Sequence, residues 1–454
     1  MISVVDYGVA NLGSMLNMLR KVGAAAELVD TPEALARATK IVLPGVGAFD
    51  HGMAALAERG LVEVLRRKAL DERAPLLGVC LGMQMLGLGS EEGAKEGLGL
   101  IRMRCRRFRL PEGSRLKVPH MGWSTIAPRQ PAARRTQRRG PVLLRPLLPR
   151  SVRARGGRSR DIAPRRGVRL RGGEWKRARR PVPSGEEPSL RHGTATQLRD
   201  TVMLNVRVIP CLLLHNGGLV KTVGFESPRY VGDPINAVRI FNDKEVDELV
   251  FLDIEATPAG RGPNYELLAD IASEAFMPFA YGGGVTTLGQ ARRLFSLGVE
   301  KVVINTAAVR IPQLIGEIAA AAGSSSVVAS IDVRRNWRGQ YSVWVGGGRH
   351  DTRRDPVAWA KELEREGAGE VLLTSINRDG TQSGYDLELV GRVSQSVGIP
   401  VVAAGGAGSM VHFREAVDRG ASAVAAGSMF VFQGKHRAVL ITYPERGDLE
   451  RVFA

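Results

Sequence analysis

The chain has 454 residues, of which 44% are hydrophobic and 24% are charged, so it is long enough for two folded domains. Its formal net charge is +18, but residues 131–199 alone carry 20 Lys and Arg against 4 Asp and Glu, a net charge of +16. The rest of the chain is therefore close to neutral, and the overall charge does not indicate that the folded parts bind nucleic acid.

Three cysteines, Cys80, Cys105 and Cys211, provide no disulfide framework, which predicts a reducing, cytoplasmic setting. The chain starts with a strand-like segment rather than a signal peptide. It contains no run of about 18 apolar residues, so we expect no membrane partner. Seven scattered histidines lack the close pairing of metal ligands, and we expect neither a metal nor a cofactor.

The first chemical signal in chain order is Cys80, which lies between two glycines. Residues 74–79 read as a short buried strand and residues 83–86 start a helical pattern, which predicts a tight strand-to-helix turn at Cys80. Such a turn exposes the sulfur, and the helix N-terminus favours the thiolate. The competing interpretation is a small buried core cysteine, but the flanking glycines favour a nucleophile.

Several motifs accompany this turn: Val4-Val5-Asp6-Tyr7-Gly8, Leu43-Pro44-Gly45-Val46-Gly47-Ala48-Phe49 and Lys117-Val118-Pro119-His120-Met121-Gly122-Trp123. With Cys80 they resemble the class I glutamine amidotransferases, in particular the glutaminase subunit of imidazole glycerol phosphate synthase. The resemblance implies that Cys80 attacks the carboxamide of glutamine. It further implies that the oxyanion is held by backbone N–H groups of Gly45, Val46, Gly47 and Leu81.

Such a glutaminase also needs a histidine and a glutamate, which the family carries in a His-Pro-Glu motif, and this motif is absent from the chain. The basic tract of residues 131–202 stands in its place. For residues 143–150 and 180–192, codons can be chosen that encode family-like sequence when the reading frame is shifted by one base. The shifted frame of residues 180–192 then includes Val-Gln-Phe-His-Pro-Glu. We therefore hypothesise a frameshift between about Arg129 and Arg139, which leaves the glutaminase inactive, its core unclosed and residues 1–130 poorly folded.

From residue 203 onward, apolar β-rich runs alternate with helical patterns, and the length suits one α/β barrel. Eight runs are predicted to be strands: 207–211, 248–253, 277–280, 301–304, 327–331, 369–374, 400–403 and 423–426. The predicted fold class is α/β, with an incomplete amidotransferase-like domain followed by a (β/α)8 TIM barrel. The predicted boundaries are 1–130, a basic and disordered segment 131–202, and 203–454.

The barrel region also repeats itself. Tyr281-Gly282-Gly283-Gly284, followed by a strand ending in Asn305-Thr306, recurs as Ala404-Gly405-Gly406-Ala407, followed by a strand ending in Gly427-Ser428. A lone glycine cluster is usually an ordinary turn, but two clusters at strand ends predict two phosphate sites at the barrel mouth. The candidate phosphate-binding residues are Gly283, Gly284, Asn305, Thr306, Gly380, Gly405, Gly406, Gly427 and Ser428.

This half resembles the cyclase subunit of imidazole glycerol phosphate synthase through Val208-Ile209-Pro210-Cys211-Leu212, Phe251-Leu252-Asp253, Ile304-Asn305-Thr306-Ala307-Ala308 and Ser375-Ile376-Asn377-Arg378-Asp379-Gly380-Thr381. The resemblance implies a bis-phosphorylated ribulosyl substrate that reacts with glutamine-derived ammonia in histidine biosynthesis. Asp379 maps to a catalytic acid or base and Asp332 to its helper, although both could instead cap loops. The family's ammonia gate maps to Arg207, Glu248, Lys301 and Glu370, for which surface salt bridges are the alternative.

The second catalytic aspartate of the family is expected where Leu213 stands, and Asn377 also replaces a common aspartate. Leucine cannot exchange a proton, so cyclase activity is in doubt. Through Leu213 and Gly217-Gly218-Leu219-Val220-Lys221, the barrel also resembles paralogues that pass ammonia to a sugar amidotransferase in surface-polysaccharide (lipopolysaccharide) synthesis. Possible partners are that enzyme or a separate, intact glutaminase subunit. The non-enzyme alternative is nucleic-acid binding through the basic tract, which lacks interleaved aromatic residues.

Overall fold

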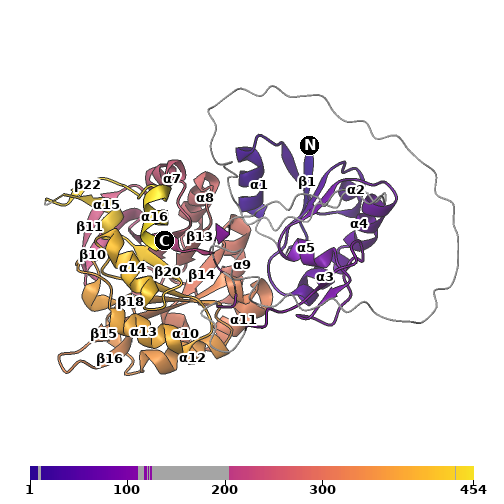
Figure 1. The fold of residues 1–454 in the computed structure, drawn as a ribbon. Helices are drawn as coiled ribbons and strands as arrows, with labels where there is room; N and C mark the ends of the chain where they lie inside the picture. The colour runs from indigo at the N-terminus through magenta and orange to yellow at the C-terminus, as the bar shows by residue number, and fades with distance from the viewer. Residues whose placement is uncertain (9–11, 111–116, 120, 122, 125–203, 435) are drawn as a thin grey trace. The chain divides into compact units, whose positions relative to one another are not determined.

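The computed structural model describes residues 1–8, 12–110, 117–119, 121, 123–124, 204–434 and 436–454. The basic tract of residues 131–202 lies outside this set, and so does the interval in which the frameshift is predicted. The described residues form an N-terminal α/β part and a C-terminal barrel, which are taken separately below (Figure 1).

The N-terminal part is built on a parallel sheet of four strands in the order β2-β1-β3-β4. Between and after the strands lie five helices, and two short strands, β5 and β6, pair in parallel beyond them. The strands are β1 (Ile2–Val5), β2 (Ala26–Val29), β3 (Ile41–Leu43), β4 (Leu76–Gly78), β5 (Gly89–Ser90) and β6 (Arg104–Cys105). The helices are α1 (Leu12–Lys21), α2 (Pro32–Ala36), α3 (Phe49–Glu58), α4 (Leu61–Leu70) and α5 (Leu81–Met85).

This part has its own hydrophobic core. Leu43, Phe49, Leu56, Leu61 and Leu65 are all completely buried, and they come from β3, α3 and α4. The apolar faces of helices α2–α5 close one side of the sheet without any residue beyond 101. The expectation that residues 1–130 are poorly folded on their own stays a prediction.

The barrel comprises eight parallel strands whose neighbours pair in chain order, and the first strand pairs with the last. The strands are β9 (Arg207–His215), β12 (Leu249–Asp253), β13 (Phe279–Gly282), β14 (Lys301–Ile304), β15 (Val327–Arg335), β18 (Glu370–Ser375), β19 (Val401–Ala404) and β20 (Ala423–Ala426). All eight predicted strands are present, and the predicted TIM barrel is confirmed.

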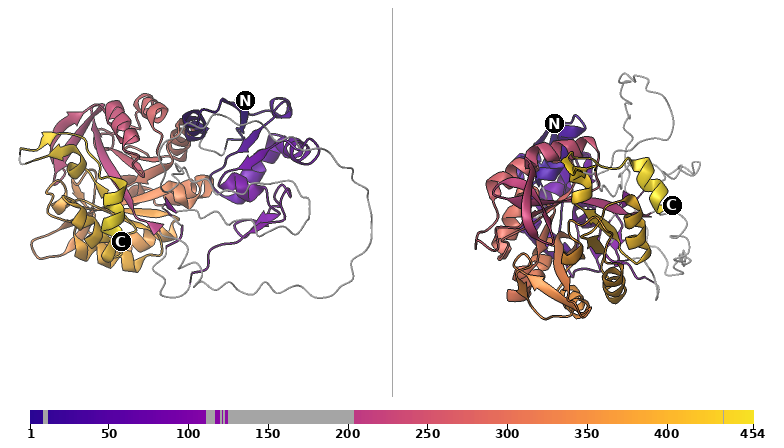
Figure 2. Two further views of the ribbon diagram at one scale, coloured as in Figure 1. Left: turned by 45° about the horizontal axis from the view of Figure 1, so that its top comes forward. Right: turned by 90° about the vertical axis from the view of Figure 1, so that its left-hand side faces the viewer.

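Helices surround the barrel strands, as two viewing directions show (Figure 2). They are α7 (Pro234–Asp243), α8 (Tyr265–Glu274), α9 (Leu288–Leu297), α11 (Gln313–Ala322), α12 (Pro356–Arg365), α13 (Leu387–Ser396), α14 (Met410–Asp418) and α16 (Arg446–Phe453). Several begin with a side-chain cap; the hydroxyl of Thr287, for example, accepts from the backbone N–H of Gln290 at the start of α9. Such caps satisfy backbone N–H groups of the first turn and fix the residue at which these helices begin.

Two side-chain layers stabilise the barrel. Inside it, Ile209, Val250, Val303, Val328 and Leu372 form one buried cluster from alternating strand positions. A larger cluster packs the outer face of the strands against the helices. The interior is thus filled by side chains, as is usual for this architecture, and the open space lies at the strand ends.

Three antiparallel hairpins and several short elements, none predicted from the sequence, are added to the barrel. The hairpins and most of the short helices follow the carboxyl ends of barrel strands, whereas η1 precedes β15 and β8 precedes β9. The hairpins are β10 (Gly218–Val223) with β11 (Glu226–Gly232), β16 (Tyr341–Val345) with β17 (His350–Asp351), and β21 (Phe432–Gln433) with β22 (Ala438–Val439). The short helices are α10 (Thr306–Arg310), α15 (Ser428–Val431), η1 (Ser324–Ser326) and η2 (Ile376–Arg378). Two further short strands, β7 (Trp123–Ser124) and β8 (Leu204–Asn205), pair antiparallel.

Candidate functional site

Cys80 lies at a strained strand-to-helix turn, as the sequence predicts. It follows β4, caps the N-terminus of α5 and has φ of 54° and ψ of −118°, a conformation that residues with a side chain rarely adopt. The glycines at this turn are required by packing. A Cβ atom at Gly82 would stand 1.8 Å from the carbonyl oxygen of Leu43, and one at Gly78 would stand 2.6 Å from Cα of Met83. The turn therefore has the geometry of a nucleophile elbow.

The electrostatic environment of Cys80 differs from the expected one. The residue is exposed to solvent, yet crowding protein atoms raise the pKa of its thiol above the ordinary value. The backbone N–H of Leu81 acts in the opposite direction and lowers the pKa, as a helix N-terminus should. The groups that shift this pKa include no histidine among the described residues, so the thiol has no visible base.

The predicted oxyanion segment packs directly against the elbow. A Cβ atom at Gly45 would stand 2.4 Å from the hydroxyl of Tyr7 and 2.9 Å from the backbone nitrogen of Gly82. The buried Tyr7 hydroxyl in turn donates to the carbonyl of Pro44 at 2.8 Å. The structure thus brings Gly45 beside the turn that contains Cys80 and Leu81. Val46 and Gly47 continue the same segment, and Gly47 has a positive φ of 95°.

At the carboxyl ends of the barrel strands lies a cavity of about 290 Å³. Both predicted glycine clusters and both predicted aspartates line it. The lining includes every candidate phosphate-binding residue: Gly283, Gly284, Asn305, Thr306, Gly380, Gly405, Gly406, Gly427 and Ser428. The two copies of the sequence repeat therefore form two glycine clusters that line the same cavity.

The first cluster follows β13 and β14. Gly284 has φ of 68°, and a Cβ atom there would stand 2.2 Å from the carbonyl oxygen of Arg261, so only glycine fits. Thr306 donates to Asn305 at 3.1 Å and accepts from the backbone N–H of Gly346 at 2.9 Å. These contacts fix the hydroxyl at the start of α10, where backbone N–H groups can receive an anion.

The second cluster follows β19 and β20. Gly406 has φ of 115°, and a Cβ atom there would stand 2.1 Å from the carbonyl oxygen of Gly384. The hydroxyl of Ser428 is buried and has no hydrogen-bond partner among the described residues. A buried polar atom without a partner costs free energy unless a ligand or water satisfies it. The second cluster thus offers a donor to an oxygen-rich ligand.

The two aspartates are held differently inside the cavity. The hydroxyl of Thr222 donates to Asp379 at 2.8 Å, whereas Asp332 accepts from Asn305 at 3.2 Å. Burial raises the pKa of Asp332 to about 7; hydrogen bonds from Thr374 and Ser330 oppose the shift, and the negative charge of Asp379 adds to it. A carboxyl group with such a pKa can both accept and donate a proton near neutral pH.

Leu213 is buried in β9 and lines the same cavity, so an apolar side chain stands where the family resemblance predicts an aspartate. Asn377 has a structural role: its side chain accepts from the backbone N–H of Arg335 at 2.8 Å and donates to the Arg335 carbonyl at 3.2 Å. An ionised aspartate could not make the second contact. Asn377 is not among the residues that line the cavity.

Sequence reasoning missed Lys221 as a cavity residue. Its side chain is buried in β10, lines the cavity, and places Nζ 2.1 Å from where a Cβ atom of Gly427 would stand. The available signal was a lysine within the apolar run Leu219-Val220-Lys221-Thr222-Val223. A buried ammonium beside Gly427 adds positive charge to the second cluster.

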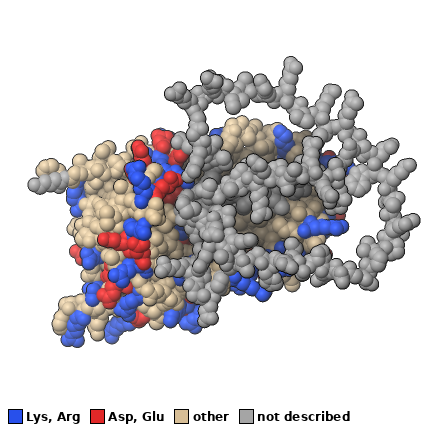
Figure 3. All heavy atoms as spheres, in the orientation of Figure 1, with Lys and Arg blue, Asp and Glu red and all other residues tan. Residues whose placement is uncertain are grey.

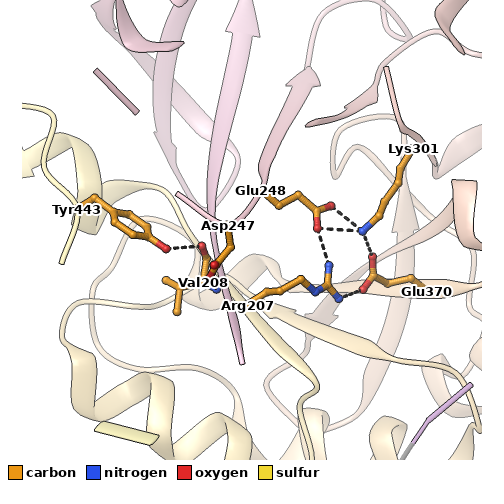
Figure 4. A network of polar contacts seen from close by, with 7 residues as sticks. All are labelled: Arg207, Val208, Asp247, Glu248, Lys301, Glu370 and Tyr443. Atoms are coloured by element: carbon orange, nitrogen blue, oxygen red, sulfur yellow. Dashed lines mark hydrogen bonds and ion pairs between the residues drawn. The ribbon is translucent and has the colours of Figure 1, made fainter. Parts of the chain in front are cut away.

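At the opposite, amino ends of the strands, the four predicted gate residues form what we call the charged ring: Arg207, Glu248, Lys301 and Glu370. Arg207 pairs with Glu248 at 2.6 Å and with Glu370, and Lys301 pairs with Glu248 at 2.7 Å and Glu370 at 3.0 Å (Figure 4). All four residues are buried, which excludes the alternative of surface salt bridges. The neighbouring cations hold the pKa of Glu370 below its ordinary value, despite its burial.

The ring is electrically neutral and closed, because each cation contacts both carboxylates. Beside it, Asp247 accepts from the backbone N–H of Val208 at 3.1 Å, and Tyr443 donates to the Val208 carbonyl at 2.8 Å (Figure 4). These bonds anchor the start of β9, which carries Arg207. The structure thus assembles all four predicted residues into one network.

On the barrel face seen in Figure 3, acidic and basic side chains are interspersed rather than gathered into one basic patch. Within the described ranges, no group of three or more His, Cys, Asp and Glu residues is placed to hold a metal ion. No helix in those ranges has the length and apolarity that crossing a membrane requires.

Two family models match the chain. Residues 3–138 match the class-I glutamine amidotransferase family, and residues 207–437, just over half of the chain, match the histidine biosynthesis protein family. Curated relatives match the second half, and each is provisionally named an imidazole glycerol phosphate synthase subunit. The hisF2 subunit of Pseudomonas aeruginosa is 56% identical over 55% of this chain and 99% of its own length.

The HisF subunits of Leptospira borgpetersenii and Leptospira interrogans are 46% and 45% identical, over 55% of this chain and their full lengths. These proteins share with the chain the half that contains the cavity and the charged ring. The N-terminal half adds the elbow at Cys80 and the predicted oxyanion segment. The chain therefore belongs to the histidine biosynthesis protein family, with a class I glutamine amidotransferase domain fused before its barrel.

Proposed function

We propose that the barrel carries out the ammonia-dependent reaction of an imidazole glycerol phosphate synthase. Ammonia would pass the charged ring, cross the barrel and meet a bis-phosphorylated ribulosyl substrate at the mouth. Lyase and ring-closing steps would give imidazole glycerol phosphate and an aminoimidazole carboxamide ribotide. The observation that carries this proposal is that one cavity gathers both glycine clusters, Asp332 and Asp379.

The geometry supports a division of roles. The two clusters suit the two phosphates of one substrate because each combines backbone N–H groups with a hydroxyl, from Thr306 or Ser428. Asp379 would act as the catalytic acid or base with Asp332 as its helper, and the pKa of Asp332 near 7 suits a group that exchanges protons at neutral pH. Arg207, Glu248, Lys301 and Glu370 would control entry of the ammonia.

The proposal includes an inactive glutaminase half. Cys80 has an elbow and an oxyanion segment, but no base is visible among the described residues. The amidotransferase match ends at residue 138, inside the interval where we predict the change of reading frame. Sequencing the DNA over codons 125–145 tests this point; codons that cannot be decoded as family sequence in the shifted frame would rule the frameshift out.

The test of the main proposal is turnover by the purified full chain of the ribulosyl bisphosphate substrate with ammonium chloride at alkaline pH. We expect imidazole glycerol phosphate to form, and its formation to depend on Asp379. No product at any ammonium concentration, with a demonstrably folded barrel, would contradict the proposal.

A second candidate function is favoured by Leu213. A buried leucine at the mouth cannot exchange a proton, whereas the charged ring is complete, as an ammonia conduit requires. In this function the barrel would deliver ammonia to a separate enzyme that amidates a surface-polysaccharide sugar. Complete inactivity of the wild-type chain towards the ribulosyl substrate, together with ammonia transfer to such an enzyme, would favour this candidate.

A further inference from the structure

Arg437 stands out because it lies in the hairpin β21–β22, outside the cavity lining, yet reaches a cavity residue. Its Nη2 atom donates to the carbonyl oxygen of Gly380 at 3.2 Å. Its guanidinium lies over the ring of Phe432, 4.8 Å from the ring centroid, which orients the side chain. Its Nε atom is buried and has no hydrogen-bond partner among the described residues.

The turn that receives this contact carries Asp379 and Gly380, and a second hairpin holds its other side. In β10–β11, the backbone N–H of Gly224 donates to the carbonyl of Asp379 at 3.0 Å, and Thr222 donates to the Asp379 carboxylate at 2.8 Å. Both carbonyls that flank Gly380 are therefore fixed, one by each hairpin. A Cβ atom at Gly380 would stand 2.2 Å from the carbonyl oxygen of Thr222, so the packing is close.

Fixing a carbonyl also fixes the N–H of the same peptide group, because a trans peptide is planar and the two point in opposite directions. Because Gly224 holds the Asp379 carbonyl, the N–H of Gly380 in the same peptide group is held in a single orientation. With the Gly380 carbonyl held by Arg437, the next peptide group is fixed as well. The N–H of Thr381 is already used, since it donates to the carbonyl of Arg378 at 3.1 Å. The ordered turn therefore offers the N–H of Gly380 to an anion without first losing conformational entropy.

The two hairpins are also joined to each other. Arg229 of β11 lies over the opposite hairpin's Phe432, 5.4 Å from the ring centroid, and Arg437 lies over the same ring. Arg229, however, has no hydrogen bond to the turn among the described contacts. The two arginines thus have the same charge and stack on the same ring, but only Arg437 contacts the turn.

We propose that Arg437 is a positioning residue: with Gly224 it clamps the Asp379–Gly380 turn and thereby preorganises the backbone N–H of Gly380, a candidate phosphate-binding residue. This inference deepens the proposed function and rests on it for the identity of the ligand. The clamp orders the turn in the free protein, before any ligand binds. It can therefore be tested with and without a ligand.

The first measurement is amide hydrogen exchange of residues 376–384 in the full chain without ligand. Arg437→Met should increase exchange in this segment by at least about tenfold, because loss of one charged hydrogen bond is of that size. Arg437→Lys should restore part of the protection, and Arg229→Met, which removes the same charge and the same stacking, should leave it unchanged. Equal protection in wild type and Arg437→Met would overturn the clamp.

The second measurement is the affinity for inorganic phosphate, followed by calorimetry with the same variants. Arg437→Met should weaken binding about tenfold, and Arg229→Met less than about twofold. Equal losses in both variants would show that Arg437 acts only through its charge and would contradict the clamp. A wild-type chain that binds no phosphate would count against the proposed phosphate clusters, while the exchange experiment would still decide the clamp.

Discussion

At the scale of single residues, Leu213 has the clearest consequence for catalysis. It lines the cavity that holds Asp332 and Asp379, and its apolar side chain can neither accept nor donate a proton there. General acid–base groups contribute about 10²–10⁴-fold to a rate. We therefore expect Leu213 to limit the rate without removing the binding site.

Leu213→Asp should increase ammonium-dependent turnover of the ribulosyl substrate by about 10²-fold or more, since it supplies the missing acid or base. The measurement is the initial rate of product formation at saturating ammonium. Leu213→Asn is the matched control, because it is polar and of the same size as aspartate but cannot titrate. Equal rates for wild type, Leu213→Asp and Leu213→Asn would show that the position takes no part in the reaction.

Asp332 makes stability depend on pH. Its pKa rises from 3.8 in the unfolded chain to about 7 in the folded protein, so the folded state keeps a proton that the unfolded state releases between these values. Wild-type stability should therefore fall as pH rises from about 4 to about 7.

Asp332→Asn should remove this contribution and be more stable than wild type at pH 8 by a few kcal/mol, with little difference at pH 4. Chemical denaturation at both pH values measures it. Asp243→Asn, an exposed helix residue, serves as a control with no such crossover. A variant that is less stable than wild type at pH 8 would contradict the assignment of a protonated Asp332.

The backbone of Cys80 is strained, as is common at the turn that carries a catalytic nucleophile. At φ of 54° and ψ of −118° a side chain costs about 1–3 kcal/mol, which glycine avoids. Cys80→Gly should therefore be more stable than Cys80→Ala by about 1 kcal/mol, measured as the difference in free energy of unfolding. Alanine at least as stable as glycine would mean that the elbow is not strained.

At the scale of elements, the charged ring ties four barrel strands together at their amino ends. Removing one cation leaves two buried carboxylates to share the other, and breaking a buried ion pair costs about 3–5 kcal/mol. Lys301→Met should have that cost, because both Glu248 and Glu370 lose a partner. The control is Arg239→Met, whose exposed pair with Glu274 contributes less than about 1 kcal/mol. Similar losses for the two variants would contradict the importance of the ring.

The sequence predicts the elements well where the pattern is simple. Eight apolar runs indicated eight strands, but the run at 277–280 begins two residues before β13, and the run at 400–403 begins one before β19. In both places the structure starts the strand just after a proline, Pro278 or Pro400, because proline has no N–H to donate to a sheet. In the three missed hairpins, β17, β21 and β22 have only two residues each and β11 contains a proline. The strands β10 and β16 have strand-like sequences and could have been predicted.

The sequence predicted which residues form the candidate site but not how they are arranged in space. Glycine clusters and motif residues mark the cavity, yet the ring joins residues up to 163 positions apart, and only the closed barrel brings them together. The buried Lys221 and the contact of Arg437 with Gly380 follow from packing of the hairpins, for which the sequence has no periodic signal.

At the scale of the whole molecule, the two halves differ in completeness. The barrel has its cavity, its charged ring and full-length relatives, whereas the N-terminal part has an elbow and an oxyanion segment without a visible base. The central claim is therefore that the barrel works with free ammonia and that Cys80 no longer supplies it.

Turnover of the ribulosyl bisphosphate substrate by one preparation of the full chain, with glutamine or with ammonium chloride as the only nitrogen source, tests this claim most directly. We predict product with ammonium chloride, no product with glutamine, and no effect of Cys80→Ala on either result. Glutamine-dependent turnover that Cys80→Ala abolishes would contradict the account, because it would require a working glutaminase within this chain.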